Sequence, residues 1–107
     1  NLTDVRWLSI TRPDRSGILF STDDPMECSA MHHADRDLFS ARHTRDLEPR
    51  RETIIKLDAH QRGLGTASCG PDTLEKYRLG PGDYTFTYRM HALSTNDDPG
   101  EVARLVV

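Results

Sequence analysis

Turn-forming residues divide this chain into short segments, and that division constrains the fold more than any other feature. Glycine, proline and aspartate recur between the apolar stretches along the whole length. Within several stretches apolar and polar residues alternate, as they do in a strand with one buried face. Short alternating segments separated by such turns are typical of antiparallel sheets. The sequence therefore predicts an all-β protein, an antiparallel β-sandwich with one short helical turn.

The predicted strands differ in how clearly they alternate. Residues 84–93 alternate best, with Tyr84, Phe86 and Tyr88 interpreted as a core stripe. The turn at 12–17, in which Pro13 presets φ and Gly17 can take a positive φ, predicts a hairpin. The Asp24–Pro25 pair is expected to break the chain again. Strands are further expected at 5–11, 18–21, 26–31, 53–60 and 77–79, a helical turn capped by Asp35 at 34–43, and an edge strand or frayed end at 101–107.

Composition bounds the size and the class of the protein. The chain has 107 residues, of which 36% are hydrophobic, and its mean hydropathy is −0.65. We expect one domain segment over residues 1–93 with a lean core, followed by a C-terminal tail over 94–107. No apolar run reaches the ~18 residues of a membrane span. Because the chain begins at Asn1 and not at a methionine, we also expect it to be a piece of a longer protein.

The balance of charges argues against nucleic acid as a partner. The chain has 14 Lys and Arg against 17 Asp and Glu, a net charge of −3. Proteins that bind nucleic acid by neutralising phosphates need a basic face. We therefore expect neither a nucleic-acid partner nor a membrane partner.

The cysteines and histidines are not spaced as the ligands of a known metal site. Cys28 and Cys69 are interpreted as free thiols in a reducing compartment, with a disulfide between them left open. Neighbours such as His32 and His33 point to opposite faces of a strand. We interpret the histidines as surface or hydrogen-bonded structural residues.

No complete catalytic set can be assembled from the sequence. The acidic pairs at 23–24 and 97–98 both precede proline, so ordinary turns explain them. The glycine-rich segment 63–73 lacks the G-x-G-x-x-G pattern of a dinucleotide site, and no G-x-S-x-G elbow exists. We interpret 63–73 as a loop that needs positive φ and carries a binding contact. Trp7 is either a core or interface anchor or a platform for a sugar.

Five segments together resemble one enzyme family. They are 3–8 (TDVRWL), 17–20 (GILF), 58–71 (DAHQRGLGTASCGP), 77–79 (YRL) and 82–86 (GDYTF). Their combination closely resembles the C-terminal end of the large bacterial β-galactosidases of glycoside hydrolase family 2, and it spans most of the chain.

The resemblance implies a non-catalytic role. In that family the segment belongs to a C-terminal β-sandwich of the mutarotase-like supersandwich type, and the catalytic glutamates lie on a barrel domain upstream. Magnesium and sodium are bound elsewhere in the parent, so no cofactor is expected in this chain. The resemblance further implies a cytoplasmic enzyme that hydrolyses galactosides such as lactose. The expected partners are the remaining domains of the parent, its galactoside substrate and further copies in a homo-oligomer.

One contact with substrate carries over by resemblance. The family's glycine-rich loop reaches over the mouth of the active site, and many members place a tryptophan there. Cys69 stands at that position, so we expect Cys69, Ser68 and Gly65 on the aglycone side and weaker aglycone binding than an indole gives. The alternative is a free-standing carbohydrate-binding β-sandwich module, and a third reading is a purely structural interaction domain.

Overall fold

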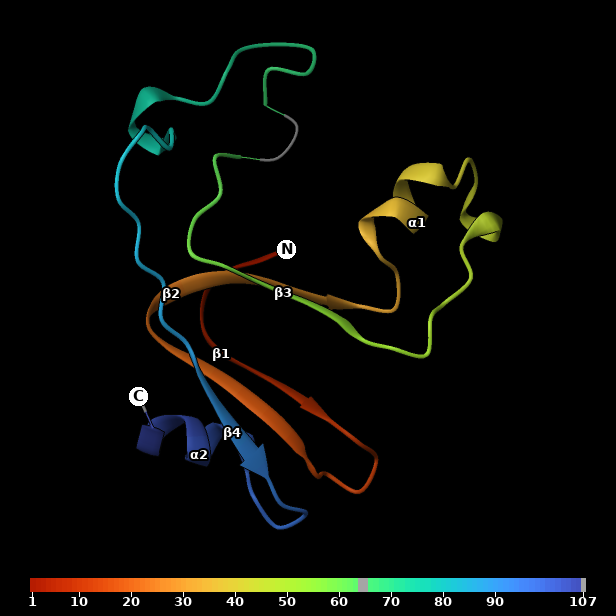
Figure 1. Cartoon of the computed structure of the whole chain (residues 1–107), viewed down its shortest axis with the longest axis vertical. Coiled ribbons are helices and arrows are strands. Elements are labelled where there is room, and N and C mark those ends of the chain that lie inside the picture. The colour runs from red at the N-terminus through yellow and green to blue at the C-terminus, as the bar shows by residue number, and fades with distance from the viewer. Residues whose placement is uncertain (64–65, 107) are drawn as a thin grey trace.

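One long strand organises the computed structural model, which describes residues 1–63 and 66–106. This strand, β2 (Gly17–Met31), runs through the middle of the sheet and pairs with other strands along both edges (Figure 1). On one edge lies β1, and on the other β4 pairs with its first part and β3 with its last part. All three pairings are antiparallel: β1 (Leu2–Thr11), β3 (Ile54–Asp58) and β4 (Arg89–Leu93).

The β1–β2 hairpin forms as the sequence predicts, although a different residue takes the unusual backbone angle. The turn closes with the N–H of Arg12 donating to the carbonyl of Ser16 at 2.8 Å. The left-handed residue is Arg15, with φ of 73°, so the expectation of a positive φ at Gly17 is wrong. Gly17 is required for another reason: a Cβ there would collide with the carbonyl oxygen of Ile10 on the paired strand.

The break expected at Asp24–Pro25 is wrong, because β2 bends there and continues. A residue before proline is pushed into extended conformations, and a strand accepts these as readily as a turn does. The register between β1 and β2 shifts between the pairs Val5–Met26 and Trp7–Ser21, which places four residues of β2 opposite one of β1. The predicted strand at 26–31 is therefore the second half of β2.

Helix α2 (Pro99–Val106) occupies the segment where an edge strand or frayed end was expected, and that expectation is wrong. The carboxylate of Asp98 accepts the N–H of Glu101 at 3.0 Å and so caps the first turn. Helical spacing gathers the apolar residues of α2 on one face. That face covers Leu19 and Leu93 of the sheet, and the packed cluster also contains Val102, Ala103 and Val106.

Two further expectations fail in the segment between β3 and β4. Residues 77–79 form no strand, and Tyr77 is the last residue of a 3-10 turn, η2 (Glu75–Tyr77). The strand expected over 84–93 is reduced to β4, since residues 84–88 lie beside no partner strand in the described part of the chain. Tyr84 and Tyr88 are therefore exposed instead of forming a core stripe.

The predicted helical turn is confirmed in shorter form. Helix α1 (Asp35–Ser40) is followed by a 3-10 turn, η1 (Thr44–Asp46). Asp37, and not Asp35, accepts the N–H of the capping residue Ala34 at 2.8 Å. Arg50 forms a bidentate ion pair with Asp37, which holds the pKa of that carboxyl well below its usual range. No helix in residues 1–63 and 66–106 is long and apolar enough to cross a membrane.

The prediction of an all-β, antiparallel, sandwich-like fold is confirmed, and the described residues form a single four-stranded sheet with short helices. The molecule measures 49 × 38 × 18 Å, and its radius of gyration of 16.7 Å exceeds the about 13 Å of a compact chain this long. Its accessible surface is 8450 Å². A compact protein of this mass exposes about 6,000 Å², so roughly 2,400 Å² of additional surface is open.

Replacing Gly17 with alanine should destabilise the hairpin by about 1–3 kcal/mol, because the added methyl group forces the two strands apart. A urea unfolding curve of the full chain measures the change. Gly70→Ala is the matched control, since a Cβ at Gly70 meets no atom within 4 Å. Equal midpoints for the two variants would contradict the close approach seen at Gly17.

Candidate functional site

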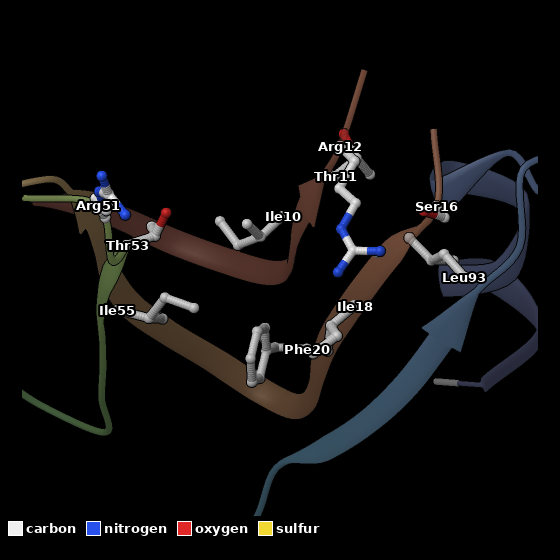
Figure 2. A pocket seen from close by; sticks show the side chains of 11 residues that line it. Ile10, Thr11, Arg12, Ser16, Ile18, Phe20, Arg51, Thr53, Ile55 and Leu93 are labelled. Carbon is white, nitrogen blue, oxygen red and sulfur yellow. The ribbon is translucent and has the colours of Figure 1, made fainter. Parts of the chain in front are cut away.

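The bend of β2 creates an apolar trough on the face of the sheet opposite α2. Ile10 pairs directly with Ile18, and directly paired residues share a face. Phe20 follows on the same face of β2, and Ile55 enters from β3. These four side chains form the floor of a cavity of about 640 Å³, and Figure 2 shows them directed into it.

Polar side chains stand at the two ends of this trough. Arg12 and Ser16 approach from the hairpin turn, and Arg51 and Thr53 approach from the chain just before β3 (Figure 2). None of the lining residues is acidic within the described part of the chain. The trough is therefore apolar at its floor and positively charged at its ends.

The glycine-rich loop forms a separate feature, which begins with the positive φ that the sequence predicts. Gly63 has φ of 129°, and a Cβ there would press against the hydroxyl of Thr66 at 2.7 Å. On the far side of the loop the N–H of Ala67 donates to the carbonyl of Pro71 at 3.2 Å. This hydrogen bond ties residue 67 to residue 71 at the exposed end of the loop.

Asp72 closes the base of the loop. Its carboxylate lies 2.6 Å from the guanidinium of Arg62 and 3.2 Å from that of Arg78. Arg78 also donates to the carbonyl of Thr73 at 2.8 Å. One carboxylate thus joins the chain before the loop to the chain after it.

The loop presents two of the three predicted site residues to solvent. Ser68 and Cys69 are exposed, and Gly65 lies outside the described residues. Figure 1 shows that the loop extends from one end of the sheet, whereas the hairpin of the trough lies at the other. The structure therefore does not bring Ser68 or Cys69 to the trough.

The turn interpretation of the acidic pairs is confirmed at 97–98, whereas 23–24 lie inside β2 and the turn interpretation is wrong there. Asp23 makes a bidentate ion pair with Arg89, at 2.7 and 2.9 Å, which lowers the pKa of its carboxyl. The N–H of Ser94 donates to Asp97 at 2.6 Å and lowers the pKa of that group also. A carboxyl with a lowered pKa is a poor proton donor near neutral pH. Neither Asp23 nor Asp97 therefore has the properties of a catalytic acid.

The described residues contain no group of three or more His, Cys, Asp or Glu placed to hold a metal ion. The Nδ1 atom of His32 lies 3.1 Å from the carbonyl of Glu52, which agrees with a structural histidine. Trp7 lies beside the first turn of α2, where a Cβ on Gly100 would be 3.8 Å from its ring. That position favours the anchor interpretation of Trp7 over the sugar platform.

Sequence reasoning missed the trough because it treated each strand separately. The turn at 12–17 fixes the hairpin register, and the register sets Ile10 opposite Ile18. That pair was a readable signal of one apolar face. The contribution of Ile55 had no such signal, since it depends on β3 pairing with the far half of β2.

The two thiols should differ in reactivity. Cys28 is buried, and burial raises the pKa of its thiol, whereas Cys69 is exposed, and both are free. The thiolate is the reactive form, so iodoacetamide should modify Cys69 alone in the folded chain and both residues in urea. Mass spectrometry of peptides after brief labelling checks this. Similar rates at the two positions without denaturant would contradict the burial of Cys28.

Comparison with known proteins places the loop and the trough, apart from its lining residue Leu93, within one family. Residues 1–90 match the sequence model of the family described as beta galactosidase small chain. A beta-galactosidase of Staphylococcus xylosus is 29% identical over 73 residues, which cover 68% of this chain and 7% of that enzyme. A beta-galactosidase of Arthrobacter sp. (strain B7) is 27% identical over 95 residues, which cover 84% of this chain and 9% of that enzyme.

The chain spans less than a tenth of the length of either relative. The match to the family covers both strands of the hairpin, β3 and the glycine-rich loop. The chain therefore belongs to the beta galactosidase small chain family.

Proposed function

We propose that this chain is a non-catalytic part of the C-terminal β-sandwich domain of a bacterial β-galactosidase of glycoside hydrolase family 2. Its role is to complete the domain and to shape the rim of an active site formed elsewhere in the parent enzyme. The parent hydrolyses terminal β-D-galactosides such as lactose. The observation that carries the proposal is the open apolar trough of a one-layer sheet in a chain of this family.

The open face supports a structural role on energetic grounds. Stable domains bury a sheet face against a second layer, and this sheet has α2 over only part of one face. Ile18, Met90 and Tyr88 are large apolar side chains on or beside the trough face, and all three are exposed. Covering the apolar side chains of this open face would stabilise the assembly, because each buried apolar side chain of this size contributes about 1.5–3 kcal/mol. The remaining strands of the parent domain are the natural cover.

The chemistry of galactoside cleavage is assigned to the rest of the parent. A retaining glycosidase needs two carboxyls on either side of the scissile bond. Asp23, Asp37 and Asp72 are each held by arginine in this chain. We likewise assign magnesium and sodium to the other domains and no cofactor to this chain. A cytoplasmic homo-oligomer is part of the same proposal.

The finer part of the proposal concerns the glycine-rich loop. With its base fixed by Asp72 and its tip exposed, the loop has the form of an element that reaches a neighbouring domain. We assign Cys69 and Ser68, with Gly65, to the aglycone side of the active-site rim. A thiol offers no flat aromatic surface to a pyranose, so aglycone binding there is expected to be weak.

Aspartate at the trough face should destabilise the parent enzyme. Met90 is 60% exposed and Ile18 is 44% exposed in this chain, so a charged side chain at either position stays in water. Beneath a second layer the same charge would be buried without a partner, which is strongly unfavourable. In the full-length product of this reading frame, Met90→Asp or Ile18→Asp should lower the melting temperature and the yield of active enzyme. Hydrolysis of o-nitrophenyl β-D-galactoside and differential scanning fluorimetry measure both.

Leu105→Asp is the matched control for these two variants, because Leu105 is 85% exposed on α2, on the other side of the sheet. Trough variants as stable and active as this control would overturn the proposal. Lactose titrated into the isolated chain should give no saturable heat. A saturable signal would favour the free-standing carbohydrate-binding module instead.

Tryptophan at position 69 should strengthen binding on the aglycone side. In the parent enzyme Cys69→Trp should lower KM for lactose severalfold and raise transglycosylation to added glucose, since an indole stacks on a sugar face. Cys69→Ser is the control that removes the thiol without adding a ring. If KM and the transglycosylation ratio do not change in Cys69→Trp, the rim assignment is wrong.

A further inference from the structure

Two arginines stand at the ends of the trough, each without a carboxylate partner among the described residues. We infer that the segment covering the trough is an extended, acidic strand, with apolar side chains on the floor and a carboxylate at each arginine. This inference rests on the proposed function, because it specifies the chemistry of the layer that the proposed function requires.

Arg12 forms no ion pair among the described residues, and the acid two positions along, Asp14, is hydrogen-bonded within the turn. The carboxylate of Asp14 accepts the N–H of Ser16 at 3.0 Å and its hydroxyl at 2.6 Å. These bonds lower the pKa of Asp14 and hold it within the turn. Figure 2 shows the guanidinium of Arg12 extended from the turn toward the floor near Ile18. The side chain therefore lines the trough, although its charge also acts on Asp14 in the turn.

Arg51 occupies the opposite end. Its neighbour Arg50 takes the carboxylate of Asp37, at 2.5 and 2.8 Å, and Lys56 pairs with Asp35. The two acids of helix α1, Asp35 and Asp37, are thus paired with cations other than Arg51. Arg51 lines the trough together with Thr53, and both stand at its other end in Figure 2.

Covering the trough would remove water from these arginines, and the lost hydration free energy must be compensated by acidic partners. A second layer over Ile10, Ile18 and Phe20 would remove water from both ends of the cavity. An arginine stripped of water without a partner is strongly destabilising, whereas a bidentate carboxylate compensates for the lost hydration. The geometry therefore selects a covering segment that carries Asp or Glu at both ends.

A second copy of this chain is a poor occupant of the trough. A two-fold contact places the same surface patch on both sides. Arginines would then meet arginines, and the trough lining contains no acid among the described residues to separate them. An extended segment suits the space better, since alternate side chains of a strand point to one face and can fill an elongated floor.

The test is binding of synthetic strands to the full 107-residue chain. The probe is the end-capped, fluorescein-labelled peptide E-S-I-S-I-S-I-S-E, in which the isoleucines and both glutamates share one face. The comparison peptides carry glutamine or lysine in place of glutamate. Fluorescence anisotropy should show the glutamate peptide binding about tenfold more tightly than the glutamine peptide, with the lysine peptide weakest. Salt at about 0.5 M should reduce that preference.

Arginine variants then locate the preference. Arg12→Gln and Arg51→Gln should each reduce the preference for the glutamate peptide over the glutamine peptide. The double variant with Arg12→Glu and Arg51→Glu should bind the lysine peptide most tightly. Arg42→Gln is the matched control, since Arg42 is also exposed but lines a different surface cavity. These side chains lie at the surface, so the variants should fold, and circular dichroism confirms this.

The outcomes separate this inference from the proposed function. Equal binding of the glutamate and glutamine peptides would overturn the inference and leave the docking face intact. No binding of the glutamate peptide, or a preference for acid that survives the double variant, would also overturn it. Failure of the proposed function is seen elsewhere, as unchanged stability and activity of the parent with Met90→Asp.

Discussion

Backbone pairing along both edges of β2 is the constraint on which the rest of the structure depends. β1 lies on one edge, and β4 and β3 share the other in succession. A strand of fifteen residues is long enough to twist and bend, and the bend falls between the regions that pair with β4 and β3. Because Ile18 and Phe20 lie on one side of that bend and Ile55 on the other, the trough is a direct product of this pairing.

The two faces of the sheet have different roles. On one face α2 covers Leu19 and Leu93, which gives the chain its packed cluster. The other face keeps the trough open, with cations at its ends. The glycine-rich loop extends from the far end of the molecule and is held by its own contacts through Asp72. Packing to the parent domain and contact with substrate are thus assigned to separate elements, which can vary independently.

Local patterns predicted the parts of the fold that local forces determine. The hairpin followed from its turn residues and from alternation in β1, and β3 followed from its apolar alternation. The positive φ of Gly63 followed from the glycine-rich loop. Asp97 and Asp98 were correctly interpreted as turn residues, since both accept backbone N–H groups, whereas the pair at 23–24 lies inside β2.

The errors arose where neighbours in space decide the outcome. Residues 84–88 alternate as a strand does, yet no strand lies beside them in the described chain, so alternation alone gave the wrong answer. The segment of α2 has the β-branched residues of a strand, but Val102 and Val106 are spaced to pack on Leu19. Predicting the trough required knowing that β3 pairs with β2 on the same edge as β4, next to it. The position of the loop relative to a substrate depends on domains outside this chain.

The bend of β2 also bears on how the molecule avoids unwanted assembly. Between Ser21 and Glu27 neither β3 nor β4 pairs with it in the described residues, and a pocket separates this stretch from residues 85–87, which leaves its backbone without a paired strand on that edge. Open edges invite strands of other molecules, and proteins guard them with charges and proline. Asp23, Asp24 and Pro25 occupy this gap, and all three are exposed. Because Arg89 neutralises Asp23, the charge of Asp24 and the missing N–H donor of Pro25 are what make this edge unfavourable for foreign strands.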